Sequence, residues 1–285
     1  MKYLITGKNG QLAQAFLRRF AVDSLDVAAP DESAADITDI DAMRMIVRDV
    51  RPDVIINCAA YNAVDRAETD AATAFRVNRD GPRVLAELAR DAGARIVHYG
   101  TDYVFDGRKQ AGLYQEQDTV NPLNLYGKSK LAGEEQAQAV HDTCLIFRLS
   151  WVFGPGKQNF IRKLREWSAV NDYLRVSCDE FSVPTYTEMI VDVTLKALNR
   201  DITGVFHLTN SGYCSRYEWA SFILKEQGIR KFIRPVTMDT FGLPAKRPSF
   251  SAMDNGEVSR LLGITIPDWQ DAVREFLKSG EDRLI

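Results

Sequence analysis

The sequence has few of the features that mark secreted, membrane-spanning or zinc-binding proteins. Four of its 285 residues are cysteines, none in a C-x-x-C pair, and the three histidines stand alone. We therefore expect free thiols in a reducing compartment and no metal site. No apolar run reaches the roughly 18 to 20 residues of a membrane span, and residues 1–7 are too short for a secretory signal. These absences favour a soluble, cytoplasmic protein with no membrane partner.

An excess of positive charge is also lacking. The chain has 36 lysines and arginines against 39 aspartates and glutamates, a formal net charge of −3. Its cations are scattered, whereas nucleic-acid binding needs a coherent basic face, so we expect no nucleic-acid partner. The hydrophobic share of 45% and the charged share of 26% are ordinary for a globular protein. A phosphate-bearing ligand could still be held by a helix N-terminus and one or two cations.

Short apolar runs alternate with helical patterns through the first 150 residues. The runs at 3–5, 25–28, 54–56, 95–99 and 144–147 are expected strands, and 12–20, 40–50, 71–92 and 125–140 are expected helices. This order predicts right-handed crossovers and a parallel sheet that is covered on both faces. We therefore expect an α/β fold with a doubly wound, Rossmann-like parallel sheet. Its ligands should bind just after the strand ends at Ile5, Asn57, Tyr99 and Leu149.

The composition of the chain changes beyond Trp151. Prolines and glycines become frequent there, and irregular stretches separate expected helices at 189–198, 217–227 and 268–277 from an expected strand at 205–208. We predict a dinucleotide-binding domain of residues 1–150 plus about 186–209. A smaller substrate-binding lobe would comprise about 151–185 and 210–285.

A glycine loop lies between the first expected strand and the first expected helix. Gly7, Gly10 and Ala13 form a G-x-x-G-x-x-A pattern. Glycine allows a sharp turn close to a pyrophosphate, and the following helix N-terminus offers free N–H groups, so the loop predicts a dinucleotide site. A plain strand–helix turn is the alternative. Asp31 follows the second strand without a neighbouring cation, which slightly favours NADH, although Lys8 could hold the extra phosphate of NADPH.

Tyr126 and Lys130 lie four residues apart on an expected helix, and hence on one face. An ammonium beside a phenol stabilises phenolate, so we expect Lys130 to lower the pKa of Tyr126 towards neutrality, a change worth roughly 3 to 4 kcal/mol. Such a tyrosine can protonate a carbonyl oxygen while hydride arrives from a nicotinamide. Thr101, at the end of the fourth strand, could hydrogen-bond the same carbonyl. A tyrosine and a lysine at this spacing are also typical of a solvated helix face. The glycine loop, Thr101 and this pair follow one another in the chain, however, and that order favours catalysis.

These residues, together with the stretches 57–65, 77–82, 101–107, 121–134, 148–154 and 247–251, resemble the dTDP-4-dehydrorhamnose reductases of the extended short-chain dehydrogenase/reductase family. The resemblance runs along nearly the whole chain. It implies hydride transfer from NADH or NADPH to the 4-keto group of a nucleotide-linked sugar, with Thr101, Tyr126 and Lys130 as the catalytic set. With the glycine loop and Asp31, it gives the expected cofactor-binding set: Gly7, Asn9, Gly10, Gln11, Leu12, Asp31, Asp36, Ile37, Ala59, Ala60, Tyr61, Asn78, Tyr126 and Lys130.

The resemblance also implies residues on the substrate side. Tyr103 and Trp151 would face the sugar, and Arg247 would lie near the substrate diphosphate. For Trp151 core packing is the alternative, and for Arg247 a surface cation. Residues 178–183 depart from the glutamine, isoleucine and glycine usual in the family, and Ala15 replaces a glutamate through which some relatives bind Mg2+, so no metal is predicted.

Other functions stay open at this point. Related enzymes include further sugar-nucleotide 4-ketoreductases, epimerases and dehydratases, but the dehydratases need a Thr-Asp-Glu run where this chain has Tyr103. A non-catalytic NAD(P)-binding regulatory subunit, similar to the β subunit of methionine adenosyltransferase, is the alternative outside enzymes. The sequence is compatible with a monomer or a homodimer.

Overall fold

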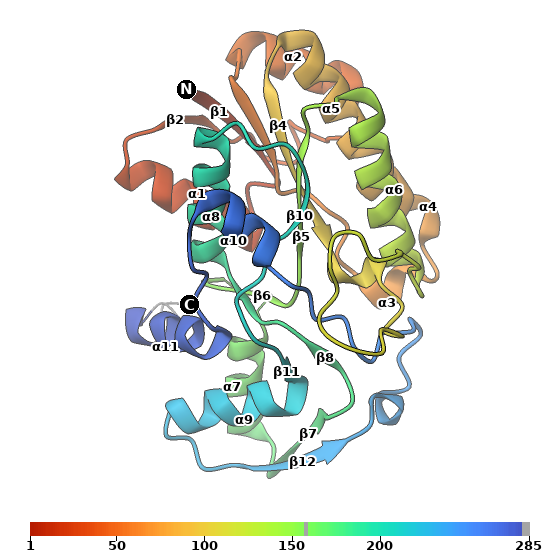
Figure 1. The fold of residues 1–285 in the computed structure, drawn as a ribbon, viewed down its shortest axis with the longest axis vertical. Coiled ribbons are helices and arrows are strands. Elements are labelled where there is room, and N and C mark those ends of the chain that lie inside the picture. The colour runs from red at the N-terminus through yellow and green to blue at the C-terminus, as the bar shows by residue number, and fades with distance from the viewer. Residues whose placement is uncertain (157–158, 281–285) are drawn as a thin grey trace.

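The computed structural model describes residues 1–156 and 159–280, and a parallel sheet forms its centre (Figure 1). Within these residues, six strands pair in parallel in the order β10-β5-β4-β3-β1-β2. They are β1 (Lys2–Thr6), β2 (Asp26–Ala28), β3 (Val54–Asn57), β4 (Arg95–Thr101), β5 (Leu145–Leu149) and β10 (Gly204–His207). The order reverses between β1 and β3, where a doubly wound sheet has its ligand crevice. The predicted α/β, Rossmann-like fold is confirmed.

Helices cover both faces of the sheet (Figure 1). One face packs on α1 (Gln11–Val22) and α8 (Thr187–Asn199), the other on α2 (Ile40–Val50), α5 (Gly81–Ala92) and α6 (Leu125–Val140). Successive β1 side chains enter opposite cores, Tyr3 and Ile5 on one side and Leu4 on the other. This burial on both faces is why the strands are continuous apolar runs. In the part of the chain that the structure describes, no helix is long and apolar enough to cross a membrane.

The long helix expected at 71–92 is interrupted. The structure has α4 (Ala71–Phe75), a π-helical turn η1 (Arg76–Asp80) and then α5. Pro82 lies in the first turn of α5, directly after the helical residues of η1, so its missing N–H removes one hydrogen bond where the two helices join. On the facing helix, a side chain at Gly133 would collide with the carbonyl of Asn78, so α6 packs directly on this turn. Such π turns are frequent at functional sites.

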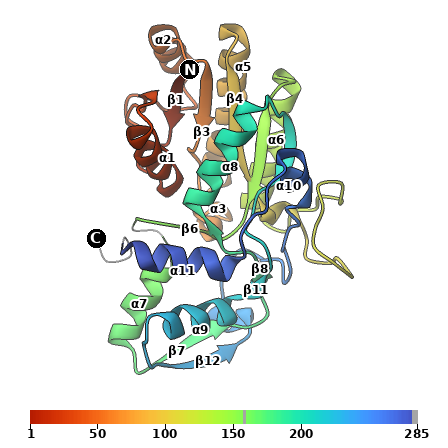
Figure 2. The same ribbon diagram turned by 60° about the vertical axis from the view of Figure 1, so that its left-hand side comes forward.

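The smaller lobe lies below the sheet in the view of Figure 2. Its strands pair as β6 (Val152–Phe153) with β9 (Thr185–Tyr186), β7 (Tyr173–Ser177) with β12 (Phe232–Val236), and β8 (Phe181–Ser182) with β11 (Cys214–Ser215). Its helices are α7 (Phe160–Val170), α9 (Arg216–Glu226) and α11 (Trp269–Ser279). The remaining short elements are α3 (Val64–Ala67), η2 (Asp102–Val104), η3 (Met238–Phe241) and α10 (Gly256–Leu262). Helix α7 and the pair β7–β12 fall in stretches expected to be irregular.

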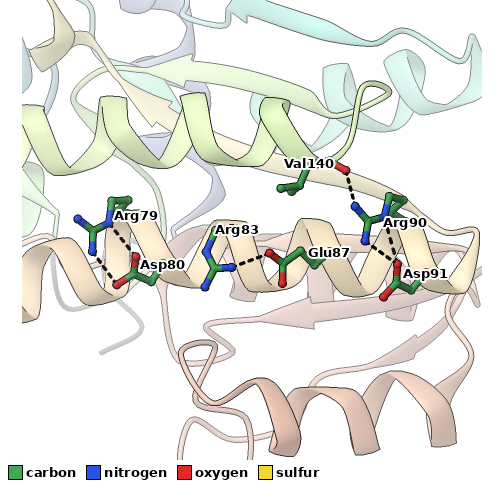
Figure 3. Close-up of polar contacts among 7 residues, drawn as sticks. All are labelled: Arg79, Asp80, Arg83, Glu87, Arg90, Asp91 and Val140. Carbon is green, nitrogen blue, oxygen red and sulfur yellow. Dashed lines mark hydrogen bonds and ion pairs between the residues drawn. The ribbon is translucent and has the colours of Figure 1, made fainter.

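A row of ion pairs follows η1 and α5 on their outer surface (Figure 3). Its members are Arg79–Asp80 at 2.7 Å, Arg83–Glu87 at 2.6 Å and Arg90–Asp91 at 2.8 Å. Arg90 also donates to the Val140 carbonyl at the end of α6, at 3.4 Å. Exposed pairs of this kind contribute about 0 to 1 kcal/mol each. The apolar core therefore holds α5 and α6 in place, and the pairs contribute little.

Candidate active site

Gly7 brings the ends of β1 and β3 together. Its φ is +70°, in the left-handed region that favours glycine. A Cβ there would also lie 2.6 Å from the backbone nitrogen of Ala59, which follows β3. Both constraints explain why the loop must begin with a glycine. Gly7 and Ala59 form one wall of the crevice at the point where the strand order reverses.

A cavity of about 600 Å³ lies at this crevice, a volume typical of cofactor sites. Of the predicted cofactor residues, Gly7, Asn9, Gly10, Gln11, Asp36, Ile37, Ala59 and Ala60 line it. Leu12, Asp31, Tyr61, Asn78, Tyr126 and Lys130 are not part of the lining. Residues outside the predicted set also line it: Lys8, Gln14, Glu32, Ala35, Cys58, Asn62, Val77, Pro155 and Gly156. Pro155 and Gly156 follow the short strand β6, which comes after the end of β5 at which ligand contacts were expected.

The end of the cavity near β2 is acidic. Burial alone would raise the pKa of Asp36, but hydrogen bonds from the Thr38 backbone and hydroxyl, with the nearby Arg76, hold it below its usual value. Asp36 is therefore ionised at neutral pH and can accept hydrogen bonds from a ribose. Lys8 forms an ion pair with Asp31 at 3.3 Å. Asp31 thus contacts Lys8, which lines the cavity, but Asp31 itself is not part of the lining.

Thr101 and Tyr126 meet at the carboxyl end of β4. The Thr101 hydroxyl accepts from the Tyr103 backbone at 3.2 Å, and a hydrogen bond with Thr101 lowers the pKa of Tyr126. The phenol of Tyr126 also donates to Asn62 Oδ1 at 3.4 Å. Helix α6 can approach so closely because Gly127 has no side chain to strike the carbonyl of Tyr103. The structure thus brings together two members of the predicted catalytic set.

Lys130 lies one turn further along α6 and is buried. Its ammonium donates to the Tyr99 carbonyl at 2.6 Å. Burial lowers the pKa of Lys130 to about 8, although the Glu134 carboxylate opposes this shift. Burial raises the pKa of Tyr126 to about 12, the Thr101 hydrogen bond opposes it and Asp102 adds to it. The expectation that Lys130 brings the Tyr126 pKa towards neutrality is therefore wrong, because the ammonium is directed at β4. Tyr126 is protonated at neutral pH.

Asn78 holds the segment after β3 against α6. Its side chain accepts from the Tyr61 backbone at 2.8 Å and donates to the Tyr61 carbonyl and the Ser129 hydroxyl, each at 3.0 Å. Ser129 in turn donates to the Tyr126 carbonyl at 2.7 Å. Asn78 therefore connects the segment after β3 to α6.

The three predicted substrate residues have different surroundings. Tyr103 is buried, and its ring meets Tyr126 edge-on at 5.9 Å between centroids. Trp151 stacks on Trp219 at 5.7 Å, and the Arg216 guanidinium covers its ring at 3.6 Å from the centroid.

The third substrate residue, Arg247, binds both carboxylate oxygens of Asp65, at 3.0 and 2.7 Å. This hydrogen-bonded pair holds the pKa of Asp65 below its usual value. Tyr103 is thus the predicted substrate residue that contacts Tyr126.

Three charged residues of the site were not predicted from the sequence. Asp102 is buried, and it accepts from the Ser182 hydroxyl at 2.8 Å and the Ser251 hydroxyl at 2.6 Å. Burial raises the pKa of Asp102 to about 6. Glu180 and Arg216 form an ion pair at 3.5 Å beside Tyr103. Asp102 and Glu180 lie within stretches that the sequence singled out, but Arg216 had no signal.

The whole chain is similar to one known family. Residues 1–281 match the model of the RmlD substrate binding domain family. The chain belongs to this family. A dTDP-4-dehydrorhamnose reductase from Burkholderia thailandensis is 36% identical over 292 residues, which cover 96% of this chain and 97% of the relative. The resemblance stated from the motifs is thereby confirmed.

Two further relatives bear on cofactor and substrate. The crystal structure of dTDP-4-dehydrorhamnose reductase from Bacillus anthracis in complex with NADP is 32% identical, with a TM-score of 0.94, and the match covers 98% of this chain and 100% of that one. A probable dTDP-4,6-dihydroxy-2-methyloxan-3-one 4-ketoreductase from Streptomyces antibioticus is 34% identical over 279 residues, 96% of this chain and 94% of the relative.

Proposed function

We propose that the protein reduces the 4-keto group of dTDP-4-dehydro-L-rhamnose to give dTDP-L-rhamnose, with NADH or NADPH as the hydride source. One observation carries the proposal: Asn62 both lines the dinucleotide-sized cavity and accepts a hydrogen bond from the Tyr126 phenol. A proton donor thus lies at the edge of the cofactor cavity, beside the Thr101 hydroxyl. The family membership and the names of the relatives support the same reaction.

The residues of the cavity fit a dinucleotide. Gly7 lets the loop turn tightly against the segment after β3, and α1 begins without a side-chain cap or an acidic residue in its first turn. Its first N–H groups are therefore available to phosphate oxygens. When bound, the cofactor supplies the hydride. Asp36 is the ionised acceptor for a ribose at the other end of the cavity.

The chain's own residues supply the proton and its geometry. Tyr126, protonated at neutral pH, donates its proton to the ketone oxygen as negative charge develops there. Thr101 directs its hydroxyl to the same oxygen and stabilises that charge. Lys130 donates its ammonium to the Tyr99 carbonyl and so holds α6, one turn beyond Tyr126, against β4. Tyr103 packs against Tyr126 and limits the space in which the sugar can turn.

A second candidate is reduction of a related keto sugar with one ring hydroxyl fewer. The name of the Streptomyces relative describes a keto sugar that has one ring hydroxyl fewer, and this favours the alternative. An epimerase or a non-catalytic NAD(P)-binding subunit remain further outcomes of the test. Residues 178–183, which differ from the usual family sequence, lie beside Tyr103. A change there should affect which sugar is bound more than it affects hydride and proton transfer.

We extend the proposal to the setting of the reaction. The division into a dinucleotide-binding domain and a substrate-binding lobe is supported by β10, which joins the sheet, and by α8, which packs on α1. Four free cysteines agree with a cytoplasmic location. We expect the nucleotide sugar to be the partner, with no nucleic acid, and a homodimer is compatible with the exposed outer faces of α5 and α6.

The experiment is an assay of cofactor oxidation with dTDP-4-dehydrorhamnose and the purified protein, with NADH and NADPH in turn. We expect oxidation of the cofactor and one equivalent of dTDP-L-rhamnose, identified by NMR. Inversion at another carbon without net oxidation would instead indicate an epimerase. Cofactor binding without turnover of any keto sugar would indicate the regulatory subunit.

A further inference from the structure

A buried charge pair lies just beyond the catalytic tyrosine. Glu180, 5% exposed, faces Arg216, with 3.5 Å between Oε2 and Nε. Its other carboxylate oxygen, Oε1, accepts a hydrogen bond from the Tyr103 phenol at 3.3 Å. A buried carboxylate costs several kcal/mol unless it is paired and hydrogen-bonded, and a pair of this kind is often no more stable than apolar side chains. We call it the Glu180–Arg216 pair, and stability alone gives no reason for it.

The pair is fixed in place on the Arg216 side. The guanidinium lies 3.6 Å from the centroid of Trp151 and 5.2 Å from that of Phe160. The Arg216 backbone also donates to the Glu180 carbonyl at 3.2 Å, because β8 and β11 bring the two residues side by side. A planar guanidinium stacked in this way can turn only one edge to the carboxylate. The Glu180 side chain therefore keeps a defined orientation.

The same pair is one aromatic ring away from the reacting centre. The ring of Tyr103 touches Tyr126 edge-on at one side, and its phenol contacts Glu180 at the other. Tyr126 donates the proton to the ketone in the proposed reaction. The Tyr103 ring thus places Glu180 one residue away from the proton donor, on the side of Tyr126 where we expect the sugar ring to lie.

We propose that the Glu180 carboxylate accepts a hydrogen bond from a ring hydroxyl of the nucleotide sugar and so selects which keto sugar is reduced. A carboxylate offers about four acceptor positions, of which Tyr103 and Arg216 use two. The group it selects is a neutral hydroxyl and not an amine, because Arg216 already balances the negative charge. The inference rests on the proposed function and deepens it: the protein prefers dTDP-4-dehydrorhamnose to the keto sugar with one hydroxyl fewer.

The test is the ratio of kcat/KM for these two keto sugars in the native protein and in Glu180→Gln. The native protein should prefer the more hydroxylated sugar by about 10- to 100-fold, the usual effect of one hydrogen bond to a charged group. In Glu180→Gln the preference should shrink about 10-fold, mainly through a higher KM for dTDP-4-dehydrorhamnose. Glu166→Gln is the matched control, since it breaks an exposed Glu–Arg pair at 2.8 Å on α7. Its ratio should equal that of the native protein.

Two results overturn the inference: an unchanged ratio in Glu180→Gln, or an equal loss for both sugars while NADPH binding stays normal. Should Glu180→Gln fail to fold, Arg216→Lys replaces it, because lysine keeps the charge but not the flat, stacked guanidinium, and the ratio should again fall. If the native protein reduces neither sugar, the proposed function has failed. The inference is then judged by calorimetry with dTDP-L-rhamnose and its 2-deoxy analogue, whose affinities should differ in the native protein and converge in Glu180→Gln.

Discussion

Arg247 binds Asp65 through two parallel hydrogen bonds, at 3.0 and 2.7 Å, although the two residues are 182 positions apart. Asp65 belongs to α3, after the third strand, and Arg247 to the C-terminal part of the smaller lobe. Their contact joins the two parts of the molecule at the side of the site where the substrate diphosphate is expected.

Variants of Arg247 and Asp65 distinguish a role in substrate binding from a role in stability. Arg247→Met should raise the KM for the nucleotide sugar by about 10- to 100-fold, because a charged hydrogen bond to the diphosphate is lost. Asp65→Asn should lower the free energy of unfolding by no more than about 1 kcal/mol, since the Asp65 side chain is 35% exposed, and should leave the KM nearly unchanged. Steady-state kinetics and urea denaturation of both variants measure these effects. Equal KM values in the native protein and Arg247→Met would place the diphosphate elsewhere.

Gly7 offers a test of the cofactor cavity. Gly7→Ala should weaken NADPH binding at least about 10-fold, because its Cβ meets the backbone of Ala59 and the left-handed φ adds strain. Gly93→Ala is the matched control: φ is +66° there, but a Cβ meets nothing within 4 Å. It should lose about 1 kcal/mol of stability and no NADPH affinity. Fluorescence titration with NADPH compares the two, and similar affinities in both would contradict the assignment of the cavity.

Lys130 should set the alkaline limit of activity. Its pKa is lowered to about 8, so the ammonium is present below that pH and is lost as the pH rises through it. The value of kcat/KM should therefore fall above about pH 8. In Lys130→Arg the charge persists, so any remaining activity should stay level to about pH 10. A pH profile of both proteins checks this, and the same decline in Lys130→Arg would assign the limit to another group.

Asp102 should make stability depend on pH. Its pKa of about 6 in the folded protein exceeds the usual aspartate value of 3.8, so folding takes up a proton between these two values. Stability from this group is therefore lost as the pH rises, by up to about 3 kcal/mol between about pH 4 and pH 7. Asp102→Asn should lack this component while it can still accept from Ser182 and Ser251. Urea denaturation at both pH values measures the difference, and parallel pH dependence of the two proteins would refute it.

The strands and the cofactor loop could be predicted because their signals are local. Burial on both faces made the strands continuous apolar runs, and Gly7 and Gly10 follow directly after the first of them. The turn at Asn78 was missed because a π-helical turn has nearly the same sequence pattern as the α-helix around it. Its position depends on Gly133, which is far away in the sequence.

The charges of the site depend on contacts between distant residues, and these were not predictable from spacing. Tyr126 and Lys130 share a helix face as expected, but the direction of the ammonium depends on the Tyr99 carbonyl of β4. Glu180 meets Arg216 only because β8 pairs with β11. In each case the residue types were visible in the sequence, whereas the contacts that set their pKa values and orientation appear only in the folded chain.

The most direct test of the account is the rate of hydride transfer in Tyr126→Phe, measured in a single turnover with NADPH and dTDP-4-dehydrorhamnose. Loss of the proton donor should slow this step by about 10²- to 10⁴-fold. The Kd for NADPH should stay nearly constant, because Tyr126 does not line the cavity. Tyr173→Phe, an exposed tyrosine of β7, is the control and should react at the native rate. Hydride transfer at the native rate in Tyr126→Phe would contradict the central claim.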